Sequence, residues 1–376
     1  MYCALLLAAF CLSQLSTLSA QGGPAQIRLT ADLRIDAVKE SLTGISTVRP
    51  GPRGLVAISQ NSDRQFRIYD STGARIAAVG RRGAGPGEFQ FVQVQGWIGD
   101  TVWAYDIPLR RSTFVSASGR VLRVAQQDNP PLTIEGRVQY ASFVTPNFIA
   151  SDGFVIGSMA VNPPGSDPRV QVQHVIGIRN GAAKSLLTAP LPDARWYVAF
   201  RYNPGATVSR DGARVGYLKV DSMVRKGGTF TVVVVKVNGD TAFVRSIPYE
   251  AVELTSHDVD SVRAALGRRK DADGFLQGPP TIPKAQIPPV QIPVNSFTLG
   301  PNGMTWIGLR HAGGRQSMLL LDANGRIVNS MELPPRSTFA AATATHVWMK
   351  ETDDDGLVSL VRYRMSGVAC KGDPCR

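Results

Sequence analysis

An all-β fold is predicted by three features of this 376-residue sequence. Glycine (37 residues) and proline (25 residues) are both frequent, as expected where many short strands are joined by tight turns. Strand-like runs alternate apolar and polar residues, and no series of them alternates with amphipathic helices, which argues against a parallel α/β sheet. The third and strongest feature is an internal repeat.

The repeat is a hairpin built around a turn that contains glycine. In RIYDSTGARIAAVG, for example, two apolar runs flank a Ser-Thr-Gly turn, and turns of this kind accommodate positive φ. A further strand precedes each hairpin, as in GLVAISQ at Gly54–Gln60, and a shorter strand precedes that one. The hairpins surround Gly73, Gly119, Gly181, Gly239, Gly325 and, most weakly, Gly367.

Six units of four strands predict a six-bladed β-propeller of antiparallel blades. The turn glycines recur at intervals that fit four short strands with insertions, which is typical of propellers. One ring-shaped domain then accounts for residues 21–376. The last unit lacks a clean fourth strand after Met365, so we expect the N-terminal run Ala25–Ile35 to pair into the sixth blade and close the ring.

The segment between the first two units carries a family resemblance. Its pattern G-x-x-G-x-G-P-G-x-F, from Gly80 to Phe89, resembles the inter-blade segment of NHL-repeat propellers, and the preceding hairpin resembles their "IxVFDxxG" strand. The chain is therefore similar to divergent NHL-like or TolB-like six-bladed propellers of exported bacterial type. The resemblance is good over about Gly54–Phe89 and weak elsewhere.

The same glycine-rich stretch, VGRRGAGPGEFQ at Val79–Gln90, also raises the possibility of a phosphate-binding loop. Such a loop needs a helix N-terminus after it. The next residues, QFVQVQGWIGD, alternate as a strand instead. We therefore interpret the glycines as a bend between blades and expect Phe89 to pack between them.

The N-terminus predicts export. Ala4–Leu18 is apolar and uncharged but short for a bilayer span, and small residues precede Gln21, so residues 1–20 are interpreted as a signal peptide. Whether this segment is cleaved or serves as an anchor stays open, as does lipidation at Cys11. We expect a periplasmic or extracellular protein, in which Cys370 and Cys375 form a disulfide or remain as two free thiols.

An insertion at about 250–293 separates the fourth and fifth units. Ser256–Lys270 can form a helix that Ser256 or Thr255 caps and Gly267 ends, whereas the segment after it is too rich in proline for a helix. This insertion could lie across the mouth of the central channel. It could equally cover only the sides of the blades.

Candidate ligand-binding residues fall into two groups. Loops between blades and loops between second and third strands should gather at one end of the ring, and they carry Arg64, Arg81, Arg82, Arg110, Arg111, Arg310 and His311. First strands should line the channel, where Arg49, Arg201, Tyr202 and Asn295 would suit a carboxylate or a sugar. The net charge of +12 is spread around the chain, so no nucleic-acid partner is expected.

Two functions are compatible with this sequence. The first is a non-catalytic scaffold that binds a peptide, glycan or protein partner on one face. The alternative is a hydrolase or lyase of the lactonase or NHL-lyase kind with a metal in the channel. The four histidines fall in separate units or in the insertion, and no HExxH or G-x-S-x-G pattern occurs, so we assign no catalytic residue, metal ligand or cofactor. Oligomeric state is open.

The channel distinguishes these two functions. Three or four His, Asp, Glu or Asn side chains that converge there would favour the enzyme. Apolar residues and lone arginines would favour the scaffold.

Overall fold

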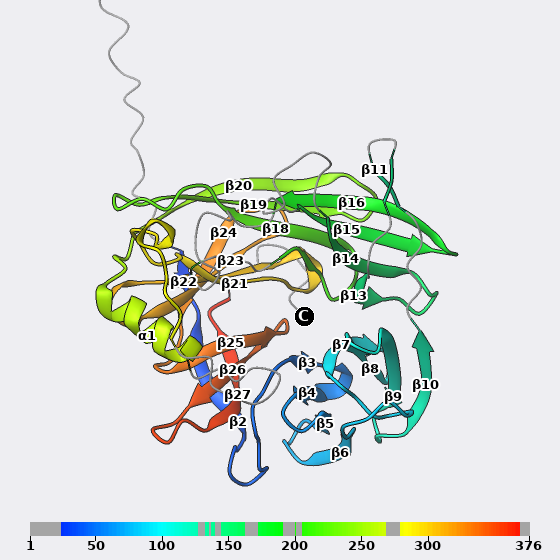
Figure 1. Ribbon diagram of the computed structural model, residues 1–376. Coiled ribbons are helices and arrows are strands. Elements are labelled where there is room, and N and C mark those ends of the chain that lie inside the picture. Colours follow the sequence, from blue (N-terminus) through cyan, green and yellow to red (C-terminus); the bar gives the residue numbers. More distant parts are fainter. Residues whose placement is uncertain are drawn as a thin grey trace, which may run out of the picture.

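The protein forms a ring of six four-stranded antiparallel sheets (Figure 1), which confirms the predicted six-bladed propeller. The computed structural model describes residues 24–126, 132–134, 137–139, 144–161, 172–190, 200, 205–267 and 279–368. Residues 1–20, Arg201, Tyr202, Cys370 and Cys375 lie outside this part of the chain.

The first five blades follow one another along the chain, and in each the first strand is innermost. Blade one consists of β3 (Val48–Pro50), β4 (Val56–Gln60), β5 (Gln65–Tyr69) and β6 (Arg75–Val79). Blade two consists of β7 (Gln93–Ile98), β8 (Thr101–Asp106), β9 (Arg111–Ser116) and β10 (Val121–Gln126). Blade three consists of β13 (Thr145–Ile149), β14 (Val155–Val161), β15 (Val172–Arg179) and β16 (Ala182–Pro190). Blade four consists of β17 (Thr207–Val208), β18 (Arg214–Val220), β19 (Gly228–Lys236) and β20 (Thr241–Tyr249). Blade five consists of β21 (Val294–Leu299), β22 (Thr305–Arg310), β23 (Gln316–Leu321) and β24 (Ile327–Glu332). A short hairpin of β11 (Leu132–Ile134) and β12 (Arg137–Gln139) lies between blades two and three in the sequence.

Both ends of the chain build the sixth blade. Its three inner strands are β25 (Ser337–Ala342), β26 (His346–Thr352) and β27 (Val358–Ser366), and its outermost strand is β2 (Arg28–Ile35). The expected closure by the N-terminal strand is therefore confirmed. In addition, β1 (Ala25–Gln26) pairs in parallel with β24 of blade five, which ties the closing segment to a second blade.

A β-bulge recurs where the third and fourth strands of each blade pair. One residue of the outermost strand has no partner opposite it, and this irregularity increases the local twist. In the first five blades the bulged residue is apolar, whereas in blade six it is an aspartate. The bulged residues are Ile76, Leu122, Leu186, Ala242, Val328 and Asp32.

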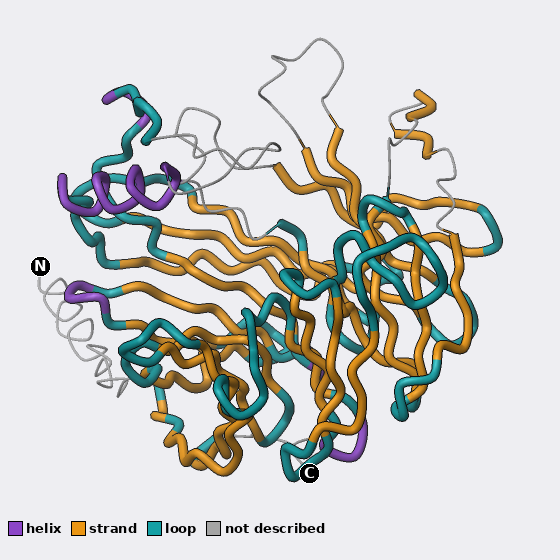
Figure 2. The backbone as a smooth tube through the Cα atoms, turned by 60° about the horizontal axis from the view of Figure 1, so that its bottom comes forward, coloured by secondary structure: helices purple, strands orange, loops and turns teal. Residues whose placement is uncertain are grey.

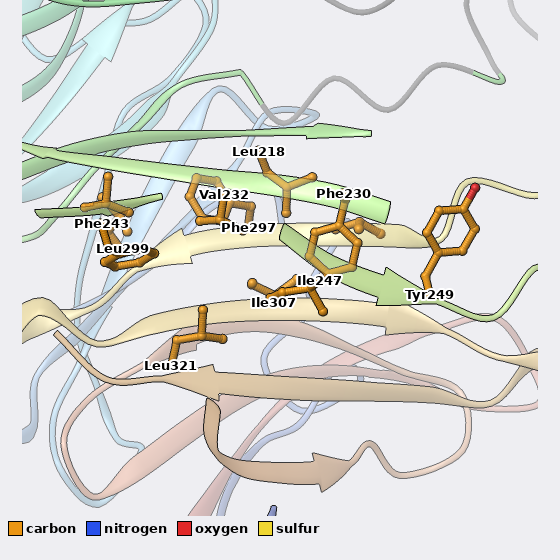
Figure 3. Close-up of a cluster of buried hydrophobic side chains, with 12 residues drawn as sticks. Leu218, Phe230, Val232, Phe243, Ile247, Tyr249, Phe297, Leu299, Ile307 and Leu321 are labelled. Atoms are coloured by element: carbon orange, nitrogen blue, oxygen red, sulfur yellow. The ribbon is translucent and has the colours of Figure 1, made fainter. Parts of the chain in front are cut away.

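The core lies between neighbouring blades, where alternate side chains of two sheets meet. Between blades four and five, Phe230 and Val232 pack with Ile307 and Leu321, and all four are completely buried (Figure 3). Full burial of side chains of this size contributes about 1.5–3 kcal/mol each. Because every blade needs a neighbour on both sides to bury its two faces, the closed ring is also the stable one.

The insertion contains one α-helix among the described residues, α1 (Ser256–Gly267), and the residues that follow Gly267 lie outside the described part of the chain. Thr255 caps it: the Thr255 Oγ1 accepts from the Asp258 N–H at 3.2 Å, and Asp258 Oδ2 accepts from the Thr255 N–H at 2.9 Å. Helix α1 lies at the outer edge of the ring, away from its centre, in both views (Figures 1 and 2). It therefore does not cover the channel. No helix in the described part of the chain is long and apolar enough to cross a membrane.

Candidate functional site

The two ends of the ring carry different connections. One end, the inter-blade end, has the connections between blades and the loops between second and third strands. The opposite end, the turn end, has the tight turns from first to second strands and from third to fourth strands. This follows from the antiparallel order of the four strands in each blade.

The glycine-rich loop at Val79–Gln90 lies at the inter-blade end and connects β6 to β7. Gly80 has φ +114, and a Cβ there would lie 2.5 Å from the Arg64 carbonyl oxygen, so only glycine fits. Phe89 is completely buried and packs edge-to-face on Phe66, with ring centroids 6.0 Å apart. The expected packing of Phe89 is confirmed. Because a strand follows the loop, no helix N-terminus is present to bind phosphate.

Two of the predicted candidates, Arg81 and Arg111, stabilise this loop. Arg81 Nε donates to Glu88 Oε1 at 2.8 Å, and Glu88 Oε2 also accepts from the Gly85 N–H at 2.8 Å. The Gly85 N–H and the Arg81 guanidinium hold the pKa of Glu88 below its usual value. Arg111 donates to the carbonyl oxygens of Ala84, Gly85 and Glu88 at 2.6–2.8 Å. The structure thus places both arginines in contacts within the protein.

The other candidates at the inter-blade end lie in two separate places. Arg64, Arg82 and Arg110 belong to blades one and two and to the loop between them. Arg310 ends β22 of blade five, and His311 follows it with Nε2 2.6 Å from Ser317 Oγ. Blade five stands opposite blade two in a ring of six, so these residues do not form one cluster.

Of the candidates expected in the channel, Asn295 lies on β21 but is engaged in its own blade. Its Nδ2 donates to Gln316 Oε1 at 2.6 Å. Arg49 lies in the middle of β3, the innermost strand of blade one. Arg49 Nε donates to the Gln95 carbonyl oxygen of blade two at 2.8 Å, and Arg49 Nη1 donates to the Val48 carbonyl oxygen at 3.1 Å. These bonds hold the guanidinium at the junction of the two inner strands.

A second arginine, Arg210, interacts electrostatically with Arg49. It follows β17 of blade four, the blade opposite blade one, and lies in a tight turn in which the Gly212 N–H donates to the Ser209 carbonyl at 2.9 Å. Burial lowers the pKa of Arg210 to about 9, and the charge of Arg49 contributes to this shift. Burial also lowers the pKa of Arg49 to about 10. Both residues are partly exposed, and burial is nevertheless the main cause of both lowered pKa values.

No carboxylate among the described residues forms an ion pair with Arg49 or Arg210. The acidic side chains of the first-to-second-strand turns are engaged elsewhere. Asp100 pairs with Arg53 at 2.8 Å, Asp152 pairs with Arg179 at 2.8 Å, and Asp211 accepts from Ser209 Oγ at 2.5 Å. The described part of the channel therefore contains two neighbouring cations whose charges are not compensated by an acid.

Sequence reasoning missed Arg210 because SRDG has the composition of an ordinary turn. A comparison of equivalent turns would have revealed it. The same position is Pro52 in blade one, Ser151 in blade three and Pro301 in blade five, none of them charged.

In the residues that the structure describes, no three or more His, Cys, Asp or Glu side chains are arranged to bind a metal ion. The histidines of the blades are far apart in the fold: His174 lies on β15, His311 follows β22, and His346 begins β26.

Comparisons with known proteins support the fold. No family model and no curated protein matches this sequence. A member of the DUF4221 family from Bacteroides vulgatus is 11% identical, with 91% of this chain and 99% of that chain covered, at a TM-score of 0.50. A protein from Bacteroides fragilis, assigned as exported, is 11% identical over 90% of this chain and 95% of that chain, at a TM-score of 0.47. Virginiamycin B lyase from Staphylococcus aureus is 11% identical over 90% and 99%, at a TM-score of 0.41. At this identity the likeness shows the fold alone.

Proposed function

We propose that this six-bladed propeller is an exported, non-catalytic scaffold that binds a peptide, glycan or protein partner. The observation that carries the proposal is that Arg49, on the innermost strand of blade one, and Arg210, after the innermost strand of blade four, have no acidic partner among the described residues. The apolar N-terminal segment supports export.

The chemistry of the channel favours binding over metal-dependent catalysis. A hydrolytic metal centre needs several imidazole, carboxylate or thiolate ligands, and those ligands must attract a cation. A protonated guanidinium has no lone pair to donate and repels a metal ion. Two such groups with interacting charges make this region positive. That field suits an anionic group on a partner.

Metal analysis of the purified protein tests the choice between scaffold and enzyme. We expect well under one equivalent of any transition metal or zinc in protein purified without chelators, and no change in melting temperature after EDTA treatment. A stoichiometric metal, together with turnover of lactones that disappears on chelation, would show that the protein is a metal-dependent enzyme and not a non-catalytic scaffold.

A binding screen supplies the positive test. Immobilised peptides and glycans, each in a neutral and an anionic form, would be probed with the intact protein. We expect retention on anionic members and loss of that retention in the Arg210→Ser variant. Retention on neutral and anionic members alike, in both proteins, would show that the channel arginines have no role in binding.

A further inference from the structure

We propose that Arg49 and Arg210 bind a doubly charged oxyanion, such as a phosphate group or inorganic sulfate, inside the channel near the turn end of the ring. This inference rests on the proposed function and deepens it, because it names the chemical group that the scaffold recognises.

The first argument is hydrogen-bonding capacity. Arg49 uses its Nε and one Nη in bonds to backbone carbonyl oxygens, which leaves Nη2 without a partner among the described residues. The Arg210 side chain makes no hydrogen bond to a described residue, and the residue is partly exposed. A guanidinium carries several donors in one plane, suited to the oxygens of an anion. The unused donors therefore lie in a region that a solute can reach.

The second argument is that the turn does not require an arginine. The equivalent position, directly after the residue whose N–H closes the turn, is proline in blades one and five and serine in blade three, although the turn of blade four is one residue longer. In blade four the arginine places a charge near another of the same sign in a desolvated region, which costs free energy. A charged side chain that lies near a like charge and makes no stabilising contact within the protein is a candidate for a functional role.

The third argument is charge and shape. A single carboxylate would neutralise only one of the two cations. Its two oxygens lie on one side of its carbon, whereas blades one and four approach from opposite sides of the channel. A tetrahedral oxyanion presents oxygens to both sides and carries the second negative charge. Partial exclusion of water strengthens each of these interactions.

The test compares the wild-type protein with Arg210→Ser, which reproduces the residue at the equivalent turn of blade three. Thermal unfolding would be followed in sodium sulfate and in sodium chloride at equal ionic strength. At sulfate concentrations about 100-fold above Kd, we expect the wild-type melting temperature to rise by about 3–4 °C. We expect no sulfate-specific rise in Arg210→Ser. Without sulfate, this variant should be at least as stable as the wild type, because the repulsion is gone.

Arg120→Ser is the matched control, since Arg120 is an exposed arginine of a turn at the same end of the ring. It should keep the full response to sulfate. An equal sulfate effect in wild type and Arg210→Ser would overturn the proposal, because it would be a general salt effect. Arg49→Gln provides an independent variant and should also lose the response.

Isothermal titration separates the sources of the anion. Inorganic sulfate, inorganic phosphate, glucose 6-phosphate and acetate would be titrated into the intact protein at about pH 8, where both phosphates are doubly charged. We expect the divalent anions to bind at least tenfold more tightly than acetate, and Arg210→Ser to weaken them at least tenfold. Tighter binding of the ester than of the inorganic ions would indicate an anionic group of a larger partner. Tighter binding of the inorganic ions would indicate a free anion. Equal affinity for acetate would refute the charge argument.

The two proposals can fail separately. A stoichiometric metal with an intact, Arg210-dependent sulfate response would remove the scaffold function but leave the anion site. Metal-free protein that binds anionic partners without any sulfate response would keep the scaffold function but remove the anion site.

Discussion

Asp32 on the closing strand β2 should contribute measurably to the stability of the ring. As the bulged residue of the strand, it has no partner opposite it, and its carboxylate turns onto the neighbouring strands of blade six. It accepts from Arg362 Nε at 2.8 Å, and His346 Nε2 lies 3.0 Å from its other oxygen. The side chains of Asp32, Arg362 and His346 are 19%, 17% and 24% exposed.

The magnitude follows from these contacts. Asp32→Asn removes the charge and leaves the half-buried Arg362 without its carboxylate. A hydrogen bond to a charged group contributes about 1.5–3 kcal/mol, and partial exposure places the value toward the middle of that range. We therefore expect the free energy of unfolding to fall by about 2 kcal/mol.

Urea unfolding followed by tryptophan fluorescence measures this loss. Trp348 is a suitable reporter, since its ring centroid lies 5.7 Å from the Arg362 guanidinium carbon. The control is Asp354→Asn, which breaks a pair with Arg336 in which the side chains are 63% and 88% exposed. That change should cost less than about 0.5 kcal/mol. Equal losses in the two variants, or no loss in Asp32→Asn, would refute the reasoning.

The same interaction sets a pH dependence. Burial alone would raise the pKa of Asp32, but the hydrogen bonds and charges of Arg362 and His346 outweigh it and hold the pKa below 3.8. The stabilisation is therefore present above the unfolded-state value and is lost as the pH falls through the lower folded-state value. The difference between wild type and Asp32→Asn should be constant near neutrality and disappear in strong acid.

Three further predictions concern the glycine-rich loop and the ring closure. Gly80→Ala should lower stability by about 2 kcal/mol or more in urea unfolding, because alanine adopts φ +114 poorly and meets the Arg64 carbonyl; an unchanged midpoint would contradict this. Arg111→Ala should speed hydrogen exchange of the Gly85 and Glu88 amides without changing the far-ultraviolet spectrum, and unchanged exchange would mean that Arg111 does not hold the loop. A chain that begins at Asp36 lacks β1 and β2, so it should aggregate or melt at a clearly lower temperature than the full-length protein.

The sequence was most informative where structure depends on neighbouring residues. Apolar alternation around turn glycines identified the hairpins, and the missing last strand identified the N-terminal run as its replacement. Both signals are local or follow from counting strands.

The channel was harder to predict because its residues come from opposite blades. Arg49 was identified as a candidate, whereas Arg210 stands in a turn whose composition is ordinary. Arg111 was expected at a ligand site, but its donors are directed to the backbone of the preceding loop. The direction of a side chain depends on bulges and strand ends. Alternation alone does not reveal these features.

The construction of blade six from both ends of the chain has a consequence for the order of folding. A polypeptide made from its N-terminus produces β2 first, but β27, the strand that β2 pairs with, is among the last to be made. The segment Arg28–Ile35 therefore lacks its native partner until β27 has been made. The charged arginines and aspartate of this segment favour its hydration before β27 is made, and they disfavour pairing with other chains.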